Sequence, residues 1–132
     1  MATESSARAS IDRIALLVCE WQGYTDHECA EALHVSVAQI WEARVAREAR
    51  YAQSADPALA EAVDHSAMHQ RLYGREYRLL TTAGLAGSRG RLQSLQAAEK
   101  AAERTVMLRR KLMEVEKQRH RGMHEDHEPT IG

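Results

Sequence analysis

The sequence is poor in residues that break helices and in aromatic side chains. Its 132 residues include two prolines, at positions 57 and 129, seven glycines and no phenylalanine. Residues that favour helices, namely Ala, Glu, Arg and Leu, are abundant instead. We therefore expect an all-α protein.

Cysteine and long apolar runs are also scarce. Cys19 and Cys29 do not have the spacing of a metal site, and we expect them to be buried free thiols in a reducing compartment. The longest strongly apolar run, residues 14–19, is too short to cross a bilayer, and residues 1–10 lack the apolar core of a signal peptide. We therefore expect a cytoplasmic protein with no membrane partner.

An excess of charge of one sign is missing as well, since the formal net charge is −1 at pH 7. Residues 1–55 hold five basic and eight acidic side chains, residues 56–90 hold four of each, and residues 91–132 hold nine and seven. This composition excludes a strongly basic nucleic-acid binder. If residues 1–55 bind DNA, several copies must act together.

Signatures of catalysis and of cofactor binding are absent from the sequence. No glycine-rich loop leads to Lys-Ser/Thr, and neither a nucleophile elbow nor a recognisable carboxylate pair occurs. His65 and His69 have helical i, i+4 spacing, and further histidines lie at residues 120–127, but no third ligand accompanies them from elsewhere. We therefore expect a non-catalytic adaptor that uses neither a metal nor a cofactor.

The sequence does contain two closely spaced helix starts within residues 24–47. Each start is a capping box, and the two pairs are Thr25 with Glu28 and Ser36 with Gln39. The chain must reverse near His34, where a helix-turn-helix commonly has glycine, and His is among the non-glycine residues that tolerate positive φ. The pattern predicts a helix-turn-helix, and the alternative is a small helical core without a role in DNA binding.

A preceding helix is expected from about Ile11 to Gln22, with Ser10 as its cap and Gly23 at its end. It should cover the two helices that follow. Its predicted buried face consists of Ile11, Ile14, Ala15, Val18 and Trp21.

The outward side chains of the second capped helix are the predicted DNA contacts. In a major groove Gln39 would suit adenine, Glu42 would suit cytosine, and small apolar side chains would suit the thymine methyl group. The arginines that follow would suit phosphates. The predicted set is Ser36, Val37, Ala38, Gln39, Trp41, Glu42, Arg44, Arg47 and Arg50. The alternatives are that the arginines form a solvated face paired in part with Glu48, and that Trp41 packs against the first helix.

A second unit follows a break in the helical pattern. The expected boundaries are a helix-turn-helix domain over residues 1–52, a linker over 53–57, a helical hairpin over 58–121 and a flexible tail over 122–132. Asp56 caps a helix that has Pro57 at its first position and runs to about Thr82. Glycines in the segment 83–90 make a turn, a second long helix runs over 91–121, and Gly122 ends it. The fold expected overall is an N-terminal helix-turn-helix domain followed by a long antiparallel helical hairpin.

We expect the hairpin to self-associate, because its apolar residues need more than one neighbouring helix. Its second helix has near-heptad apolar spacing. The predicted oligomerisation residues are Leu72, Tyr73, Tyr77, Leu80, Leu92, Leu95, Ala98, Ala101, Thr105, Leu108, Leu112 and Val115. The alternative is that the hairpin packs back on the N-terminal domain in a monomer.

The stretch GYTDHECAEALHVSVAQIWEARVAR resembles the homeodomain-like helix-turn-helix of small terminase subunits of tailed bacteriophages, of transposases and of sigma-factor region four. The order of reader, linker, hairpin and charged tail is similar to that of a small terminase subunit. That resemblance implies a homo-oligomeric ring in the host cell cytoplasm that binds packaging-initiation double-stranded DNA. It further implies recruitment and regulation of the large terminase subunit, an ATPase and nuclease, through the tail. The alternatives are a dimeric helix-turn-helix transcriptional regulator and a helical scaffold without a DNA partner.

Overall fold

The computed structural model describes residues 11–83 and 89–127, with side chains up to residue 122. This part of the chain contains helices and no strand, which confirms the all-α class. The helices are α2 (Arg13–Trp21), α3 (Asp26–Leu33), α4 (Val37–Gln53), α5 (Pro57–Thr82) and α6 (Arg89–His127). Among these described helices, none is both long and apolar enough to traverse a bilayer. Ser10 and most of the predicted glycine turn lie outside the described residues.

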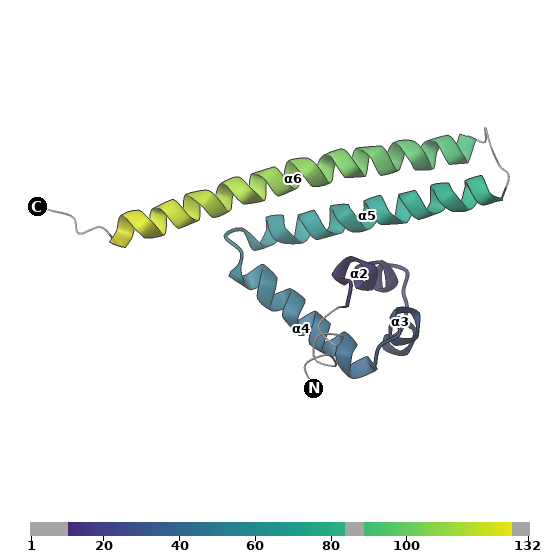
Figure 1. The fold of residues 1–132 in the computed structure, drawn as a ribbon, viewed down its shortest axis with the longest axis horizontal. Coiled ribbons are helices and arrows are strands. Elements are labelled where there is room, and N and C mark those ends of the chain that lie inside the picture. The colour runs from purple at the N-terminus through teal and green to yellow at the C-terminus, as the bar shows by residue number, and fades with distance from the viewer. Residues whose placement is uncertain (1–10, 84–88, 128–132) are drawn as a thin grey trace, which may run out of the picture.

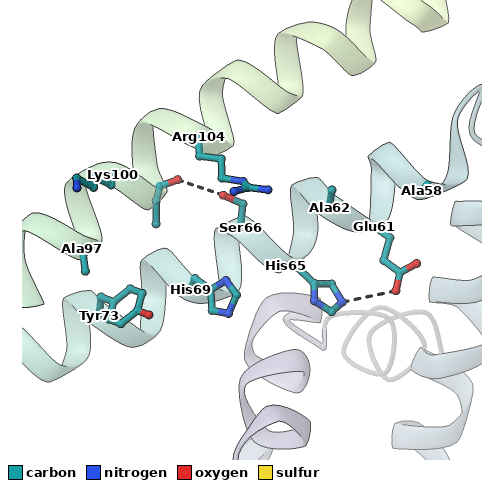
Figure 2. Close-up of a pocket in the computed structure, with 11 residues that line it drawn as sticks. Ala58, Glu61, Ala62, His65, Ser66, His69, Tyr73, Ala97, Lys100 and Arg104 are labelled. Atoms are coloured by element: carbon teal, nitrogen blue, oxygen red, sulfur yellow. Dashed lines mark hydrogen bonds and ion pairs between the residues drawn. The ribbon is translucent and has the colours of Figure 1, made fainter.

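The two long helices α5 and α6 lie side by side and run antiparallel (Figure 1). As predicted, Asp56 caps α5, and its carboxylate accepts a hydrogen bond from the Leu59 N–H at 3.0 Å. Small and polar side chains line the seam between the helices. The Ser66 hydroxyl donates to the Ala101 carbonyl at 3.2 Å (Figure 2). The Thr105 hydroxyl oxygen lies 2.9 Å from the Ser66 hydroxyl oxygen. The seam therefore brings the two backbones close together.

Helix α6 is longer than the sequence predicts. It continues through Gly122 to His127, so the prediction that Gly122 ends the helix is wrong. A glycine inside a helix costs only about 1 kcal/mol and stops it only when the backbone leaves the helical conformation, and Gly122 does not have a positive φ. The 39 residues of α6 span about 58 Å against about 39 Å for the 26 residues of α5. The C-terminal end of α6 therefore projects beyond the start of α5 (Figure 1).

Helices α2, α3 and α4 form a small N-terminal group around their own core. The buried residues of this core are Leu16, Cys19, Cys29, Ala30 and Ile40. Both cysteines are free and buried, as predicted, and burial raises the pKa of both thiols. They therefore remain protonated and act as small apolar side chains.

Helix α2 ends as predicted, with Gly23 in a left-handed conformation at φ 81°, but its start and its buried face differ from the prediction. Its cap is Asp12, whose carboxylate accepts hydrogen bonds from the N–H groups of Ile14 and Ala15 at 3.0 and 3.2 Å. Trp21 was expected in the core, but this is wrong, because its side chain is 60% exposed and makes only an edge contact with the His69 ring. The helix buries two faces instead of one, so a single predicted stripe could not describe it.

The second buried face of α2 packs against α5. Ile14, Leu17 and Val18 form a cluster with Met68, which is 1% exposed. The N-terminal group therefore rests on the long helices within one chain, which is the packing that the monomer alternative required. This cluster is the apolar joint between the two parts of the molecule.

Replacing Met68 with alanine should loosen this joint. A buried Met→Ala change removes contacts and leaves a cavity, so we expect the free energy of unfolding to fall by about 3 kcal/mol in urea denaturation. Met113→Ala is the control, because Met113 is exposed, and it should change stability by less than about 0.5 kcal/mol. Equal effects of the two substitutions would contradict the assignment of Met68 to a structural joint.

Candidate nucleic-acid interface

The chain reverses between α3 and α4 in a single left-handed residue. His34 has φ 57° and ψ 44°, which confirms the predicted positive φ. The N–H of His34 donates to the Glu31 carbonyl at 3.3 Å, and the N–H of Val35 donates to the Ala30 carbonyl at 3.0 Å. These two bonds are those of a Schellman motif, which ends α3 and fixes the direction in which α4 starts.

The His34 turn can be tested by substitution. His34→Gly removes the Cβ penalty of the left-handed conformation, and we expect it to stabilise the protein by about 0.5 kcal/mol or to leave it unchanged. His34→Val puts a β-branched residue into the same conformation and should destabilise by about 1–2 kcal/mol. The measurement is thermal unfolding of both variants, and a more stable valine variant would contradict the turn geometry.

Both predicted capping boxes are present and hold the starts of α3 and α4. At α3 the Thr25 N–H donates to the Glu28 carboxylate at 2.9 Å, and the Glu28 N–H donates to the Thr25 hydroxyl at 3.2 Å. At α4 the equivalent distances between Ser36 and Gln39 are 2.8 and 3.1 Å. The Ser36 hydroxyl and the Gln39 carbonyl therefore already accept bonds, and the Gln39 amide N–H groups are left to face a ligand.

The outward face of α4 is mainly apolar. Trp41 is 56% exposed and Val45 is 68% exposed, while Ala38 and Glu42 are also exposed beside them. More than half of the Trp41 side chain therefore faces solvent, and the Arg44 guanidinium lies 5.2 Å from the centre of its ring. Val37, by contrast, is half-buried against the core of the N-terminal group.

Two of the predicted phosphate contacts on α4 are held by carboxylates of the N-terminal group. Glu20 binds Arg44 at 2.8 Å and Arg47 at 2.6 Å, and Arg44 also binds Asp26 at 2.8 Å. The side chains of Arg44 and Arg47 are only 21% and 12% exposed. Their partners are Glu20 and Asp26, whereas the sequence had suggested Glu48.

The third arginine, Arg50, pairs with Asp64 of α5. Asp64 is buried and also lies 3.4 Å from the Arg13 guanidinium and accepts a hydrogen bond from the Tyr51 hydroxyl at 2.8 Å. Burial and the Asp64 carboxylate raise the pKa of Tyr51. Sequence reasoning missed this cluster, although Asp64 shares a helical face with the buried residues Ala60 and Met68 and could have been noticed as a charge among apolar neighbours.

The ionisation of Glu20 depends on its arginines. Burial alone would raise its pKa, but the hydrogen bonds from Arg47 and Arg44 outweigh this, and the pKa of Glu20 is lowered from its ordinary value of 4.5. A group whose pKa is lowered by folding stabilises the folded state above that ordinary value. This contribution is lost as the pH falls through the lowered pKa.

Glu20→Gln should therefore destabilise the protein at neutral pH. We expect a loss of about 2 kcal/mol at pH 7, because two partly buried guanidinium groups lose a charged partner. Glu31→Gln is the control, because Glu31 is exposed on α3. In urea denaturation the difference between Glu20→Gln and the unmodified protein should shrink at a pH well below 4.5. A difference that does not change with pH would contradict the role of the ion pair.

The two histidines with metal-ligand spacing have separate neighbours. His65 lies 3.7 Å from the Glu61 carboxylate, and the His69 ring contacts Trp21 and lies near Tyr73 (Figure 2). Within the described residues, no three His, Cys, Asp or Glu side chains gather where a metal ion could sit. The histidines at the C-terminal end of α6 beyond residue 122 lie outside the described side chains.

Most of the predicted oligomerisation residues are at least partly covered within the chain. Thr105 and Leu108 of α6 are buried, and Leu72 of α5 packs against the cluster of α2 with Met68. The half-buried members of the set are Leu72, Tyr77, Leu80, Leu95, Ala98, Ala101, Leu112 and Val115. Leu92 and Tyr73 are exposed and remain accessible to a second copy.

Comparisons of the chain with known protein families, with curated proteins and with solved structures give no match.

Proposed function

We propose that this chain is a non-catalytic, DNA-binding adaptor of viral genome packaging, of the small terminase subunit kind. In this role it recognises packaging-initiation DNA, assembles into a homo-oligomeric ring, and recruits and regulates a large ATPase and nuclease subunit. Double-stranded DNA, further copies of the chain and the large subunit are its partners, and the host cell cytoplasm is where it acts.

The observation that supports this proposal best is the geometry between α3 and α4. Two helices with complete capping boxes are joined through one left-handed residue, His34, and their inner faces share a core with α2. This leaves the outer face of α4 open, with Ala38, Trp41 and Glu42 near its start, where a recognition helix meets base edges. We therefore propose these three side chains, together with the amide of Gln39, as the reading surface.

The arginines of α4 have a smaller part in this proposal than in the sequence prediction. Arg44 and Arg47 can reach phosphates only by giving up Glu20. They are better described as positioning residues that set the angle of α4. Ser36 and Val37 also have structural roles, since Ser36 caps α4 and Val37 packs against the core of the N-terminal group.

Large apolar side chains support self-association through the outer surface of the long helices. The exposed ones on α5 and α6 are Tyr73, Leu79, Leu92, Val106, Met107 and Met113. Exposed apolar side chains of this size lose contact with water when a partner surface covers them. A second copy is the occupant that the adaptor proposal requires.

Trp41→Ala is the substitution that tests the reading surface. Duplexes enriched from a random-sequence pool on the unmodified protein should bind the variant at least about tenfold more weakly, because a base contact is worth about 1–3 kcal/mol. Trp21→Ala is the matched control, since Trp21 is the other exposed tryptophan and lies on α2. The readout is fluorescence anisotropy, accompanied by light scattering of the free protein.

Three outcomes separate this proposal from its competitors. A particle of many copies that loses sequence preference in Trp41→Ala supports the packaging adaptor. A stable dimer that selects palindromic duplexes supports the transcriptional regulator instead. No salt-dependent DNA binding even at low ionic strength would overturn both and favour a helical scaffold.

A further inference from the structure

The C-terminal half of α6 is the most cationic segment of the described chain. Residues 109–121 contain six Lys or Arg side chains and two carboxylates, a net charge of +4 in a protein whose total is −1. The six cations are Arg109, Arg110, Lys111, Lys117, Arg119 and Arg121, and all are exposed. One of the two carboxylates, Glu116, is engaged in accepting hydrogen bonds from the Ala55 N–H at 2.8 Å and the Ser54 hydroxyl at 3.2 Å.

Within the side chains that the structure describes, these cations differ from those of α4 in having no carboxylate partner. Among the described residues, no ion pair involves any of the six, and Arg119 donates only to the Gln53 carbonyl, at 2.7 Å. On α4, by contrast, Glu20, Asp26 and Asp64 neutralise the three arginines. The charge that can bind phosphate therefore lies on α6 rather than on the helix whose sequence suggested it.

Stabilisation of α6 itself does not account for this concentration of charge. Cations favour the C-terminal end of a helix through its dipole, but the effect fades within the last turn, and α6 continues to His127. Pairs of opposite charge at i, i+4 would stabilise the helix, yet Arg110 and Glu114 form no such ion pair in the structure. Arg119, which donates to the Gln53 carbonyl, lies beside the segment that precedes α5, and α6 continues past the start of α5 (Figure 1).

The spacing of the exposed cations fits a phosphate backbone. Arg110, Lys117 and Arg121 are separated by seven and four residues, so they lie on one side of α6. They span about 17 Å of helix axis at 1.5 Å per residue. One DNA strand carries a phosphate every ~3.4 Å of its own axis, so this distance covers about five phosphates. Three long cationic side chains can reach three of these without any fixed bond geometry.

We propose that residues 109–121 of α6 form a second, sequence-independent DNA-binding surface that contacts the phosphates of duplex DNA. Arg110, Lys117 and Arg121 are its central contacts. This inference rests on the proposed function in taking DNA as the ligand. It assigns sequence-independent phosphate binding to α6 and base recognition to α4. In an oligomer several such surfaces act on one duplex, so modest single-copy affinity becomes strong binding.

The test is a triple charge-removing variant, Arg110→Gln/Lys117→Gln/Arg121→Gln, titrated with a short duplex of arbitrary sequence. Each lost phosphate contact reduces the magnitude of the negative slope of log affinity against log salt by about 0.9, so this magnitude should fall by about 2–3 between about 50 and 200 mM salt. Affinity at the lower salt concentration should fall at least about tenfold. The charge-preserving variant Arg110→Lys/Arg121→Lys should keep the affinity and slope of the unmodified protein.

The matched control removes the same charge from the other end of the long helices. Arg75→Gln/Arg78→Gln/Arg89→Gln alters three exposed arginines and should leave the salt slope nearly unchanged. Circular dichroism of all variants establishes that they are folded, since every substituted side chain is exposed.

The possible outcomes distinguish failure of the α6 surface from failure of the proposed function. If both triple variants lose affinity equally, net charge alone is responsible and the α6 surface is overturned. If the α6 variant binds like the unmodified protein, the α6 surface is overturned while DNA binding by α4 stands. If the unmodified protein binds polyglutamate but no duplex at low salt, the proposed function and the α6 surface both fall.

Discussion

The N-terminal group depends most on the ion pairs that the Glu20 carboxylate forms with Arg44 and Arg47. This carboxylate lies on α2 and holds Arg44 and Arg47 of α4, and those arginines in turn keep it ionised in a partly buried position. Because the three charges need one another, the angle between α2 and α4 is set by ion pairing as well as by the apolar core. The same interaction withdraws two cations from the surface that faces outward, so it determines both the shape and the charge of that face.

The pairing of Arg44 and Arg47 with Glu20 bears on two features of the N-terminal group that would otherwise conflict. The segment that resembles a DNA reader belongs to the most acidic part of the chain, and its outer face presents Ala38, Trp41, Glu42 and Val45 rather than cations. Such a face can discriminate bases by shape and hydrogen bonding but supplies little of the electrostatic affinity on which DNA binding depends. The proposed division between a reading face on α4 and a DNA-binding cationic surface on α6 would reconcile the two features within one chain.

The parts of the fold that could be predicted from the sequence are those determined over a few residues. The two capping boxes, the left-handed residue at His34 and the Asp56-Pro57 start of α5 are local devices, because each partner lies within four positions of the other. The exposure of Trp21 and the cluster around Asp64 depend on how the N-terminal group rests on α5. The partners of Arg44 and Arg47 depend on how α2 and α3 pack against α4. No periodicity within one helix contains that information. The continuation of α6 over residues 122–127 could not be predicted, because a glycine ends a helix only when it adopts a left-handed conformation, and the sequence does not reveal that conformation.

The seam between α5 and α6 bears on why the chain should need further copies of itself. Ser66, Ser94 and Thr105 are buried in it together with the apolar Leu108, and small residues such as Ala101 allow the two helices to approach closely. The larger apolar side chains Val106, Met107 and Met113 lie outside it. A helix pair that leaves these three side chains outward can gain stability by burying them against an equivalent surface of a second copy. Such an assembly would also bring several α6 cationic segments together on one particle, and this joins self-association and DNA affinity in a single physical argument.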